Sequence, residues 1–419
     1  MNREQTKFVL TSVSGNILEW YDFALYGYFA TVIAKLFFPA KDEFISLMIT
    51  FGVFASGFIA RPLGGIIFGH IGDKYGRRIA LVASIFLILV PTTLMGLLPS
   101  YNSIGFLAPL LLTILRLLQG VAVSGELTGS GIFLIECAPE KYKAFYGSLI
   151  MCSTYLGLLM GAAICVIVTL AFSTEQVLDF AWRIPFIISF FFGVGALFLR
   201  IKCEESPVFK KLLEDKKTLK LPVWDALKNY PLPIILICLV SSALAVAIYL
   251  LIGYFPSYFI ASKFLSLNES MVVSFLGLLA LTIFVPTIGY FIGVVGHKVV
   301  LSIGALCCIV FSYLIFYFAS IGSFESSIFS VVLTAACLSP IAASIILTIT
   351  KIFPTNVRYS GVSIGYNISM TIFGGTTPLI AMYLIKKTGS ALAPSIYLMA
   401  SGIITLLALF FIKKIKVTY

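Results

Sequence analysis

Long runs of apolar residues follow one another along the whole chain, separated by short polar or charged breaks. A helix that crosses the hydrocarbon core of a bilayer needs about 20 apolar residues, and most of these runs reach that length. The runs show no alternation with a period of two, which would predict the strands of a barrel. The pattern predicts twelve membrane-spanning helices, at about 8–38, 44–70, 79–99, 104–136, 144–171, 182–200, 231–262, 270–293, 299–320, 326–350, 359–385 and 392–412.

The composition agrees with this pattern. Of the 419 residues, 60% are hydrophobic and 11% are charged, whereas soluble domains have roughly a quarter of their residues charged. A chain with so few charges cannot cover its surface with polar groups, so lipid is the expected solvent. The fold class predicted is therefore an all-α membrane protein.

The net charge of +11 is distributed in a way that predicts an orientation. Most of the 29 Lys and Arg residues, Lys416 among them, fall in alternate loops on one side, whereas the other side keeps only a few, such as Lys41. By the positive-inside rule the basic loops and both termini are cytoplasmic, which predicts a multi-pass protein of the cell inner membrane. A nucleic-acid partner is not expected, because such a site would form a basic stripe on one face of a fold.

A long charged stretch, residues 202–229, divides the predicted helices into six and six. We expect an N-terminal six-helix bundle over 1–200, a cytoplasmic linker over 201–229 and a C-terminal six-helix bundle over 230–419. A flexible connection suits two lobes that move against each other.

A weak internal repeat relates the two predicted bundles. Residues 69–78 match residues 289–298, and residues 139–143 match residues 354–358 at nearly the same offset. Two matches in one register indicate duplication, so the bundles are expected to be pseudo-symmetric.

The loop after the second predicted helix carries a charge cluster. Asp73 lies at a helix end, and Arg77 and Arg78 can pair with Glu136 at the end of the fourth helix. We interpret these four residues as a cytoplasmic gate that holds one conformation. The alternative is a tight basic turn that only orients the protein.

Three motifs resemble those of a known family. Residues 69–78 resemble the loop 2–3 signature of the major facilitator superfamily, and residues 116–120 are similar to its fourth-helix motif. Residues 15–23 resemble the first-helix signature of the metabolite:proton symporter branch. The resemblance covers essentially the whole chain and implies two pseudo-symmetric six-helix bundles that transport by alternating access, without a cofactor.

Within that branch the resemblance is divided. Residues 126–133, 254–258 and 367–369 look most like the proline/betaine transporters. Residues 28–39 and 372–378 look at least as much like the citrate carriers. The proline/betaine transporters are the closest resemblance.

The chain departs from the family pattern at two places that matter. Gly293 stands where the second-half loop usually has an acid, and His297 and Lys298 stand where it has paired arginines, so we expect a weak latch there. The sequence ends at Tyr419 without the coiled coil of some osmosensing carriers, so gating by such a tail is not expected.

Five charged residues are the clear cases of charge at membrane depth, away from the ends of the predicted helices, and all are in the first half: Glu19, Asp22, Arg61, Arg116 and Glu126. Each costs about 2.5–3.5 kcal/mol at mid-membrane on insertion scales, so their expected role is functional. Arg61 is interpreted as a helix-packing or gate residue.

The remaining intramembrane charges form a hypothetical transport site. Arg116 would bind a substrate carboxylate, and Asp22 or Glu126 would carry the coupling proton. The alternative is that Arg116 is permanently paired with one of the acids. The substrate-binding residues predicted are Glu19, Asp22, Tyr26, Arg116, Gln119 and Tyr249. Aromatic residues of the first and seventh helices are candidates for a cage around an ammonium group, and the alternative is that they face lipid or pack. They are Trp20, Tyr21, Phe23 and Tyr26 of the first helix and Tyr249, Tyr254 and Tyr258 of the seventh.

These features predict a monomeric proton-coupled symporter that imports a small zwitterionic solute such as proline or glycine betaine. The alternatives are a proton symporter of an organic acid such as citrate or α-ketoglutarate, a non-transporting receptor, or an efflux pump. The sequence has no nucleotide-binding loop, nucleophile motif or metal-ligand spacing, so neither an enzyme nor a metal site is expected.

Overall fold

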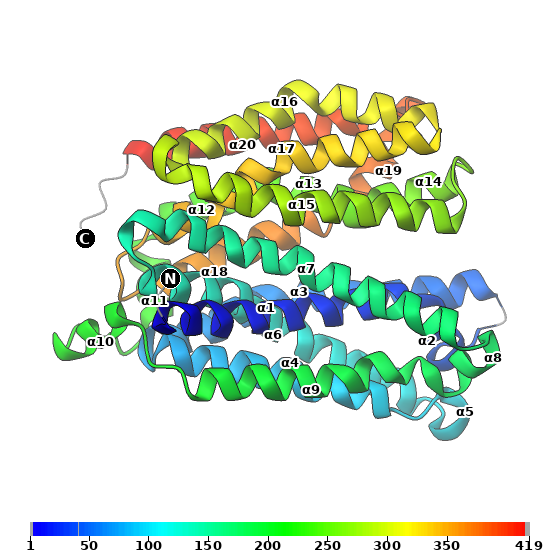
Figure 1. The fold of residues 1–419 in the computed structure, drawn as a ribbon, viewed down its shortest axis with the longest axis horizontal. Coiled ribbons are helices and arrows are strands. Elements are labelled where there is room, and N and C mark those ends of the chain that lie inside the picture. Colours follow the sequence, from blue (N-terminus) through cyan, green and yellow to red (C-terminus); the bar gives the residue numbers. More distant parts are fainter. Residues whose placement is uncertain (1–2, 41, 415–419) are drawn as a thin grey trace.

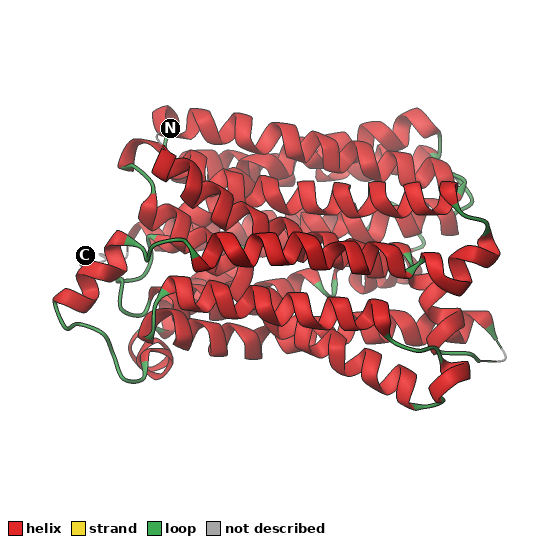
Figure 2. Ribbon diagram, turned by 60° about the horizontal axis from the view of Figure 1, so that its bottom comes forward, coloured by secondary structure: helices red, strands yellow, loops and turns green. Residues whose placement is uncertain are grey.

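The structure is a computed structural model that describes residues 3–40 and 42–414, and the described residues form helices joined by short loops (Figure 2). Residues 1–2, 41 and 415–419 lie outside the described residues, so Lys41, Lys416 and the extreme ends of the expected bundles are not placed.

The first half contains seven long or medium helices that correspond to the first six predicted spans. They are α1 (Arg3–Tyr28) continued by α2 (Ala30–Phe37), α3 (Glu43–Lys74), α4 (Arg77–Leu97), α6 (Leu107–Cys137), α7 (Lys143–Ala171) and α9 (Arg183–Ile201). The connections contain the short helices α5 (Tyr101–Ile104), η1 (Glu140–Tyr142), α8 (Thr174–Gln176) and η2 (Val177–Ala181).

The second half begins after two linker helices, α10 (Pro207–Glu214) and α11 (Pro222–Asn229). Its seventh span is built from α12 (Pro231–Val240), α13 (Ser242–Tyr249), η3 (Leu250–Tyr254) and α14 (Phe255–Ala261). The others are α15 (Leu267–Val295), α16 (His297–Ile321), α17 (Phe324–Thr350), α18 (Arg358–Ser369) continued through η4 (Met370–Gly374) to α19 (Thr377–Thr388), and α20 (Pro394–Lys414).

Within the described residues, 11 helices are long and apolar enough to cross a membrane. The remaining predicted span is α1 with α2, whose hydropathy is lowered by Glu19 and Asp22. This span packs against α6, α7 and α9, so its polar side chains face protein rather than lipid. The predicted all-helical membrane fold is confirmed.

The two halves meet mainly through two pairs of helices, α7 with α15 and α3 with α18. Counted as spans, these are the fifth with the eighth and the second with the eleventh. A shift of six spans exchanges one pair for the other, as a pseudo-twofold axis between the halves requires. In Figure 1 the blue-to-green helices of the first half lie below the yellow-to-red helices of the second.

The start of α1, the end of α20 and the linker helix α10 lie at the same end of the molecule, at the left in Figure 1. We call this end the linker end. The short helices α5 and α8 lie at the opposite end.

Two spans of the second half change their helical winding at mid-length. The seventh and eleventh spans each contain one π-helical turn, η3 and η4. A Cβ on Gly374, in η4, would lie 2.5 Å from the ring of Tyr249, so the two spans touch closely here. Irregular turns of this kind often occur at functional sites, and η4 packs against α3 of the first half.

Candidate functional site

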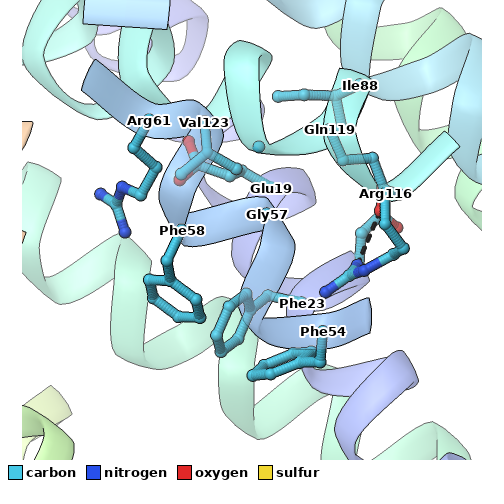
Figure 3. Close-up of a pocket in the computed structure, with 12 residues that line it drawn as sticks. Glu19, Phe23, Phe54, Gly57, Phe58, Arg61, Ile88, Arg116, Gln119 and Val123 are labelled. Atoms are coloured by element: carbon cyan, nitrogen blue, oxygen red, sulfur yellow. Dashed lines mark hydrogen bonds between the residues drawn. The ribbon is translucent and has the colours of Figure 1, made fainter. Parts of the chain in front are cut away.

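A pocket lies within the first half. The empty space inside it and at its mouth is about 430 Å³. Its lining comes from α1, α3, α4 and α6 (Figure 3). The lining residues are Glu19, Asp22, Phe23, Phe54, Gly57, Phe58, Arg61, Ile88, Arg116, Gln119, Gly120 and Val123. Four of the six residues predicted to bind substrate are among them.

Two glycines allow the pocket wall to form. A Cβ on Gly120 of α6 would lie 2.1 Å from the carbonyl oxygen of Gly57 on α3, so the two backbones touch at this point. Only residues without a side chain permit this approach, as in other membrane helix pairs. The contact fixes the spacing of Phe58 and Gln119 across the wall.

Gly120→Ala is therefore expected to push α3 and α6 apart and to reduce uptake sharply, with a loss of stability of about 1–3 kcal/mol from overpacking. The matched control is Gly52→Ala on the same helix α3, where a Cβ would meet nothing within 4 Å. Thermal unfolding in detergent and initial uptake rate measure the two effects. Equal behaviour of the two variants would contradict the prediction.

Arg116 is buried in the pocket but is not paired with an acid. Its Nη1 donates to Gln119 Oε1 at 2.7 Å, and its Nε has no hydrogen-bond partner. The guanidinium carbon lies 4.2 Å from the ring centroid of Tyr26 and 5.0 Å from that of Phe54. The aromatic faces stabilise the cation while leaving a donor for a ligand. The expected alternative, a permanent ion pair, is not present among the described residues.

A chain of neutral groups connects Arg116 to Asp22. Gln119 Nε2 donates to Thr92 Oγ1 at 2.6 Å, and Thr92 Oγ1 lies 2.6 Å from Asp22 Oδ2. The other carboxylate oxygen of Asp22 has no partner. Thr92 was not identified from the sequence, because a threonine within an apolar helix usually bonds only to its own backbone.

Glu19 is more isolated than Asp22. The side chain is 2% exposed, and neither carboxylate oxygen has a hydrogen-bond partner. A charged carboxylate buried without a partner costs several kcal/mol, so Glu19 differs from Asp22 and Glu126, whose carboxylates have hydrogen-bond partners. Glu19 lies between Arg61 and Arg116 in the view of Figure 3.

Glu126 does not line the pocket. It forms a fully buried ion pair with Arg200 of α9, whose Nη1 lies 2.6 Å from Glu126 Oε2. Ser84 and Ser130 also donate to this carboxylate, at 2.8 and 2.9 Å. Glu126 is therefore one partner of an ion pair with complete hydrogen bonding, and it is not one of the acids that line the pocket. Arg200 was counted from the sequence only among the basic residues near the linker.

Two predicted substrate contacts, Tyr26 and Tyr249, lie behind the lining. The Tyr26 hydroxyl donates to the carbonyl of Thr50 at 3.1 Å while its ring supports Arg116. Tyr249 contacts the ring of Phe58 at 5.4 Å, and its hydroxyl accepts from Arg61 Nη1 at 3.4 Å. Both tyrosines thus position residues that line the pocket.

The aromatic part of the pocket comes from α1 and α3. The ring centroids of Phe23 and Phe54 are 4.7 Å apart, and Phe58 lies 5.7 Å from each. Tyr254 and Tyr258 of the second half instead stack on each other, at 5.3 Å. Of the aromatic residues predicted as a cage, Phe23 lines the pocket, and Phe54 and Phe58 are additional. The sequence signal that could have identified Phe54 and Phe58 is their four-residue spacing, which places both rings on one face of a helix.

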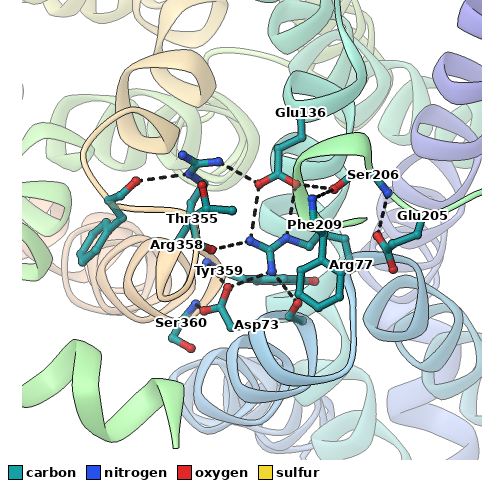
Figure 4. A network of polar contacts seen from close by, with 12 residues as sticks. Asp73, Arg77, Glu136, Glu205, Ser206, Phe209, Thr355, Arg358, Tyr359 and Ser360 are labelled. Atoms are coloured by element: carbon teal, nitrogen blue, oxygen red, sulfur yellow. Dashed lines mark hydrogen bonds and ion pairs between the residues drawn. The ribbon is translucent and has the colours of Figure 1, made fainter. Parts of the chain in front are cut away.

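A buried polar network joins the two halves at the linker end (Figure 4). Arg77 lies 3.1 Å from Asp73 and 3.3 Å from Glu136, and Arg358 of the second half lies 2.9 Å from Glu136. The Arg77 Nη2 also donates to the carbonyl of Thr355 at 2.7 Å.

The carboxylate of Asp73 receives the first amides of α18. The backbone N–H groups of Tyr359 and Ser360 donate to its two oxygens at 3.1 and 2.8 Å. A carboxylate at a helix N-terminus is stabilised by the free amides and the helix dipole. The network therefore closes the linker end between the halves.

Arg78, the fourth predicted gate residue, lies outside this network. Its backbone N–H donates to Glu205 at 3.0 Å, and its side chain donates to the carbonyl of Ile201 at 2.6 Å. Burial raises the pKa of Glu205, which caps this turn from the linker. Ser206 then donates to Glu136 at 2.6 Å, so the linker also contacts the gate.

The pseudo-symmetric counterpart of this network lies where the loop after α6 meets the end of α17, and the ion pairs described there are exposed. Glu140 lies 2.5 Å from Lys143 and 3.9 Å from Lys351, and its side chain is 75% exposed. Exposed pairs of this kind contribute about 0–1 kcal/mol.

Asp73→Asn is expected to loosen the linker end. The amide replaces one acceptor by a donor, so the contact with the two α18 amides is weakened. Ser360, whose hydroxyl is buried without a partner, provides a reporter: a Ser360→Cys thiol should react about 10-fold faster with a maleimide in the Asp73→Asn background. Glu140→Gln, which breaks only exposed pairs, is the control and should leave the rate unchanged.

These features define a membrane transporter with a pocket between helices and a closed end. Residues 7–220 match the family described as Sugar (and other) transporter. The described helices superpose on the proton:xylose symporter XylE of E. coli bound to 6-bromo-6-deoxy-D-glucose with a TM-score of 0.79. The match covers 98% of this chain and 95% of that chain at 15% sequence identity, and it concerns the fold.

Relatives of the full length give a closer match. A Staphylococcus aureus (strain MSSA476) protein, provisionally named a proline/betaine transporter, is 34% identical over 428 residues, 100% of this chain and 91% of that protein. The proline/betaine transporter of Escherichia coli K12 is 30% identical over 413 residues, 96% of this chain and 82% of that protein. The chain therefore belongs to the Sugar (and other) transporter family, and it is not an enzyme. Its fold is that of the major facilitator superfamily symporter XylE.

Proposed function

We propose that this protein imports a small zwitterionic solute, such as proline or glycine betaine, together with protons. The observation that carries the proposal is the state of Arg116: a buried guanidinium with an unpartnered Nε and no ion pair among the described residues. A charged donor of this kind is suited to a solute carboxylate. The full-length similarity to proline/betaine transporters supports the same class of solute.

The other end of the solute would lie against the rings of Phe23, Phe54 and Phe58. A quaternary or secondary ammonium is attracted to aromatic faces, and a nearby acid reinforces the attraction. The pocket lining holds two arginines and two acids. When both acids are charged the lining is neutral, and a neutral zwitterion then balances its charges better than a polyanion does.

Glu19 is our choice for the proton carrier. Both of its oxygens are buried and unpartnered, whereas Asp22 is bonded to Thr92 and Glu126 is paired with Arg200. A carboxyl that is stable only when neutral in one conformation must hold a proton there and can release it when its surroundings change. Asp22 remains the second candidate.

The linker end is proposed to face the cytoplasm, in a protein of the cell inner membrane that works as a monomer. The basic loops 74–78 and 200–228 support this orientation by the positive-inside rule. The closed gate at that end then corresponds to a conformation closed to the cytoplasm, as alternating access requires of one of its states.

The pocket arginines leave an organic acid as the second candidate solute. Arg61 and Arg116 both line the pocket, and with neutral acids they would suit a dicarboxylate such as α-ketoglutarate. Purified protein in liposomes with an imposed pH gradient separates the two, using labelled glycine betaine, proline, citrate and α-ketoglutarate. We expect accumulation of betaine or proline that collapses with a protonophore. Accumulation of citrate or α-ketoglutarate alone would replace our proposal by the second candidate.

A further inference from the structure

Arg61 links the pocket to the second half. It lines the pocket and is 3% exposed, yet its side-chain hydrogen bonds go to the other half of the molecule. Its Nε donates to Asn367 Oδ1 at 3.2 Å and its Nη1 donates to the Tyr249 hydroxyl at 3.4 Å. Both partners are neutral, so the guanidinium charge is not compensated by them.

The Asn367 amide is held in place from both sides of the interface. Its Nδ2 donates to the carbonyls of Ser124 in the first half, at 3.2 Å, and Ser363 in its own helix, at 2.9 Å. The Asn367 oxygen is thereby fixed toward Arg61. The contact of Arg61 with the second half consequently depends on α3 and α18 staying together.

Glu19 faces Arg61 across the pocket floor without bonding to it. The charged and titratable groups around Glu19 are Asp22 of α1, Arg61 of α3, Glu126 of α6, Arg200 of α9, Tyr249 of α13 and Tyr366 of α18. Arg200 is already paired with Glu126, and Arg116, the other cation that lines the pocket, donates to Gln119 and lies over the ring of Tyr26. Arg61 is the pocket cation whose hydrogen bonds go to the second half, so its partners change when the halves separate.

We propose that Arg61 exchanges partners during transport, from Asn367 and Tyr249 when the linker end is closed to Glu19 when it is open. Arg61 is in this sense a positioning residue for the proton, and the proposal rests on the proposed function. Neither the Glu19 carboxyl nor the Arg61 guanidinium has a charged partner in the closed conformation, whereas both gain one in the open conformation.

The exchange gives a physical cause for proton release. Opening the linker end separates α3 from α18 and removes the two neutral partners of Arg61. The guanidinium then turns to Glu19, whose charged form gains a counter-ion, and the proton leaves Glu19 for water at the open end. On closing, Arg61 returns to Asn367 and Tyr249, and Glu19 takes up a proton again. By linkage, the proton on Glu19 favours the closed end by the same free energy.

The experiment compares Arg61→Gln, Arg61→Lys and Glu19→Gln with the unchanged protein in liposomes, using labelled glycine betaine and proline. Two quantities are measured for each: accumulation driven by a pH gradient, and exchange of internal for external solute without a gradient, as a function of pH. Arg183→Gln is the control, because Arg183 donates to the carbonyls of Gly96 and Leu98 far from the pocket.

We expect Arg61→Gln and Glu19→Gln to lower accumulation at least about 10-fold while keeping part of the exchange, and to flatten its pH profile. The double variant should be no worse than either single variant, because both remove the same step. Arg61→Lys keeps the charge and should recover part of the accumulation. Arg183→Gln should behave as the unchanged protein.

Three results would overturn the inference. The first is normal accumulation in Arg61→Gln. The second is a folded Arg61→Gln that loses exchange and accumulation equally, which indicates a role in solute binding or packing alone. The third result applies if Arg61→Gln does not fold, so that only Arg61→Lys can be measured. The inference then fails if Arg61→Lys folds and keeps the native pH profile of exchange, yet accumulates as little solute as Glu19→Gln does. If the unchanged protein moves neither solute, the proposed function fails, which is a different outcome from these three.

Discussion

Replacement of Arg116 by glutamine is expected to reduce uptake by about 100-fold. The substitution keeps a polar side chain of similar length but removes the charge that would hold the solute carboxylate, and a charge-assisted hydrogen bond contributes about 1.5–3 kcal/mol. Lysine at this position keeps the charge but loses the planar fork and its stacking on Tyr26, so Arg116→Lys should fall between the two. The loss should appear in the solute concentration needed for half-maximal exchange.

Two comparisons make this prediction specific. Arg183→Gln removes an arginine that is bonded to backbone carbonyls near the opposite end, and should leave uptake unchanged. A methyl ester of glycine betaine, which lacks the carboxylate, should be bound equally poorly by the unchanged protein and by Arg116→Gln. If Arg116→Gln took up betaine at the normal rate, the carboxylate would have to bind elsewhere.

Glu126→Gln is expected to destabilise the protein by about 3–5 kcal/mol. The substitution leaves Arg200 charged, fully buried and without its counter-ion in a region that water does not reach. Thermal unfolding in detergent, followed by tryptophan fluorescence, should show a large decrease in the transition temperature. The effect on transport should follow from the loss of folded protein.

A double variant separates stability from proton coupling. Glu126→Leu together with Arg200→Leu removes both charges, and replacing a buried ion pair by apolar residues is often neutral or stabilising. We expect this variant to fold and to keep accumulation driven by a pH gradient. If the double variant is stable and exchanges solute but no longer accumulates it, Glu126 carries the coupling proton, which is one of the two assignments made from the sequence.

The helical membrane fold was predictable because its causes are local. Twenty apolar residues between polar breaks are enough to place a span, and the split of the seventh and eleventh spans at η3 and η4 does not change their length. The charges of the first half were also predictable as functional candidates, because Glu19 and Arg116 are costly in lipid. Four of the six predicted substrate-binding residues line the pocket, although their role in binding remains a prediction.

The pairing of those charges was not predictable. Glu126 and Glu19 look alike in the sequence, as acids within apolar helices, but one is paired with Arg200 and the other has no partner. Arg200 lies 74 positions away in a different helix, and only tertiary packing decides which acid it reaches. The same holds for Thr92, which joins Asp22 to Gln119 by its depth in α4.

The contacts between the halves were the most difficult to predict. Arg61 and Asn367 are 306 positions apart, and neither residue type identifies the other as its partner. Tyr249 lies part-way along the seventh span, at the end of α13; its hydroxyl contacts Arg61, and it is not among the residues that line the pocket. Such contacts depend on the conformation as well as on the fold, so one sequence corresponds to several sets of them.

The contact of Asp73 with α18 is made entirely by main-chain amides on the second-half side. These two hydrogen bonds therefore do not depend on the side chains at positions 359 and 360, although both positions are buried and closely packed and a replacement must still fit. Proline at position 360 would delete a donor, since it has no N–H. The lock at this end is thus encoded asymmetrically: one helix must keep a particular acid, while the facing helix answers with its backbone.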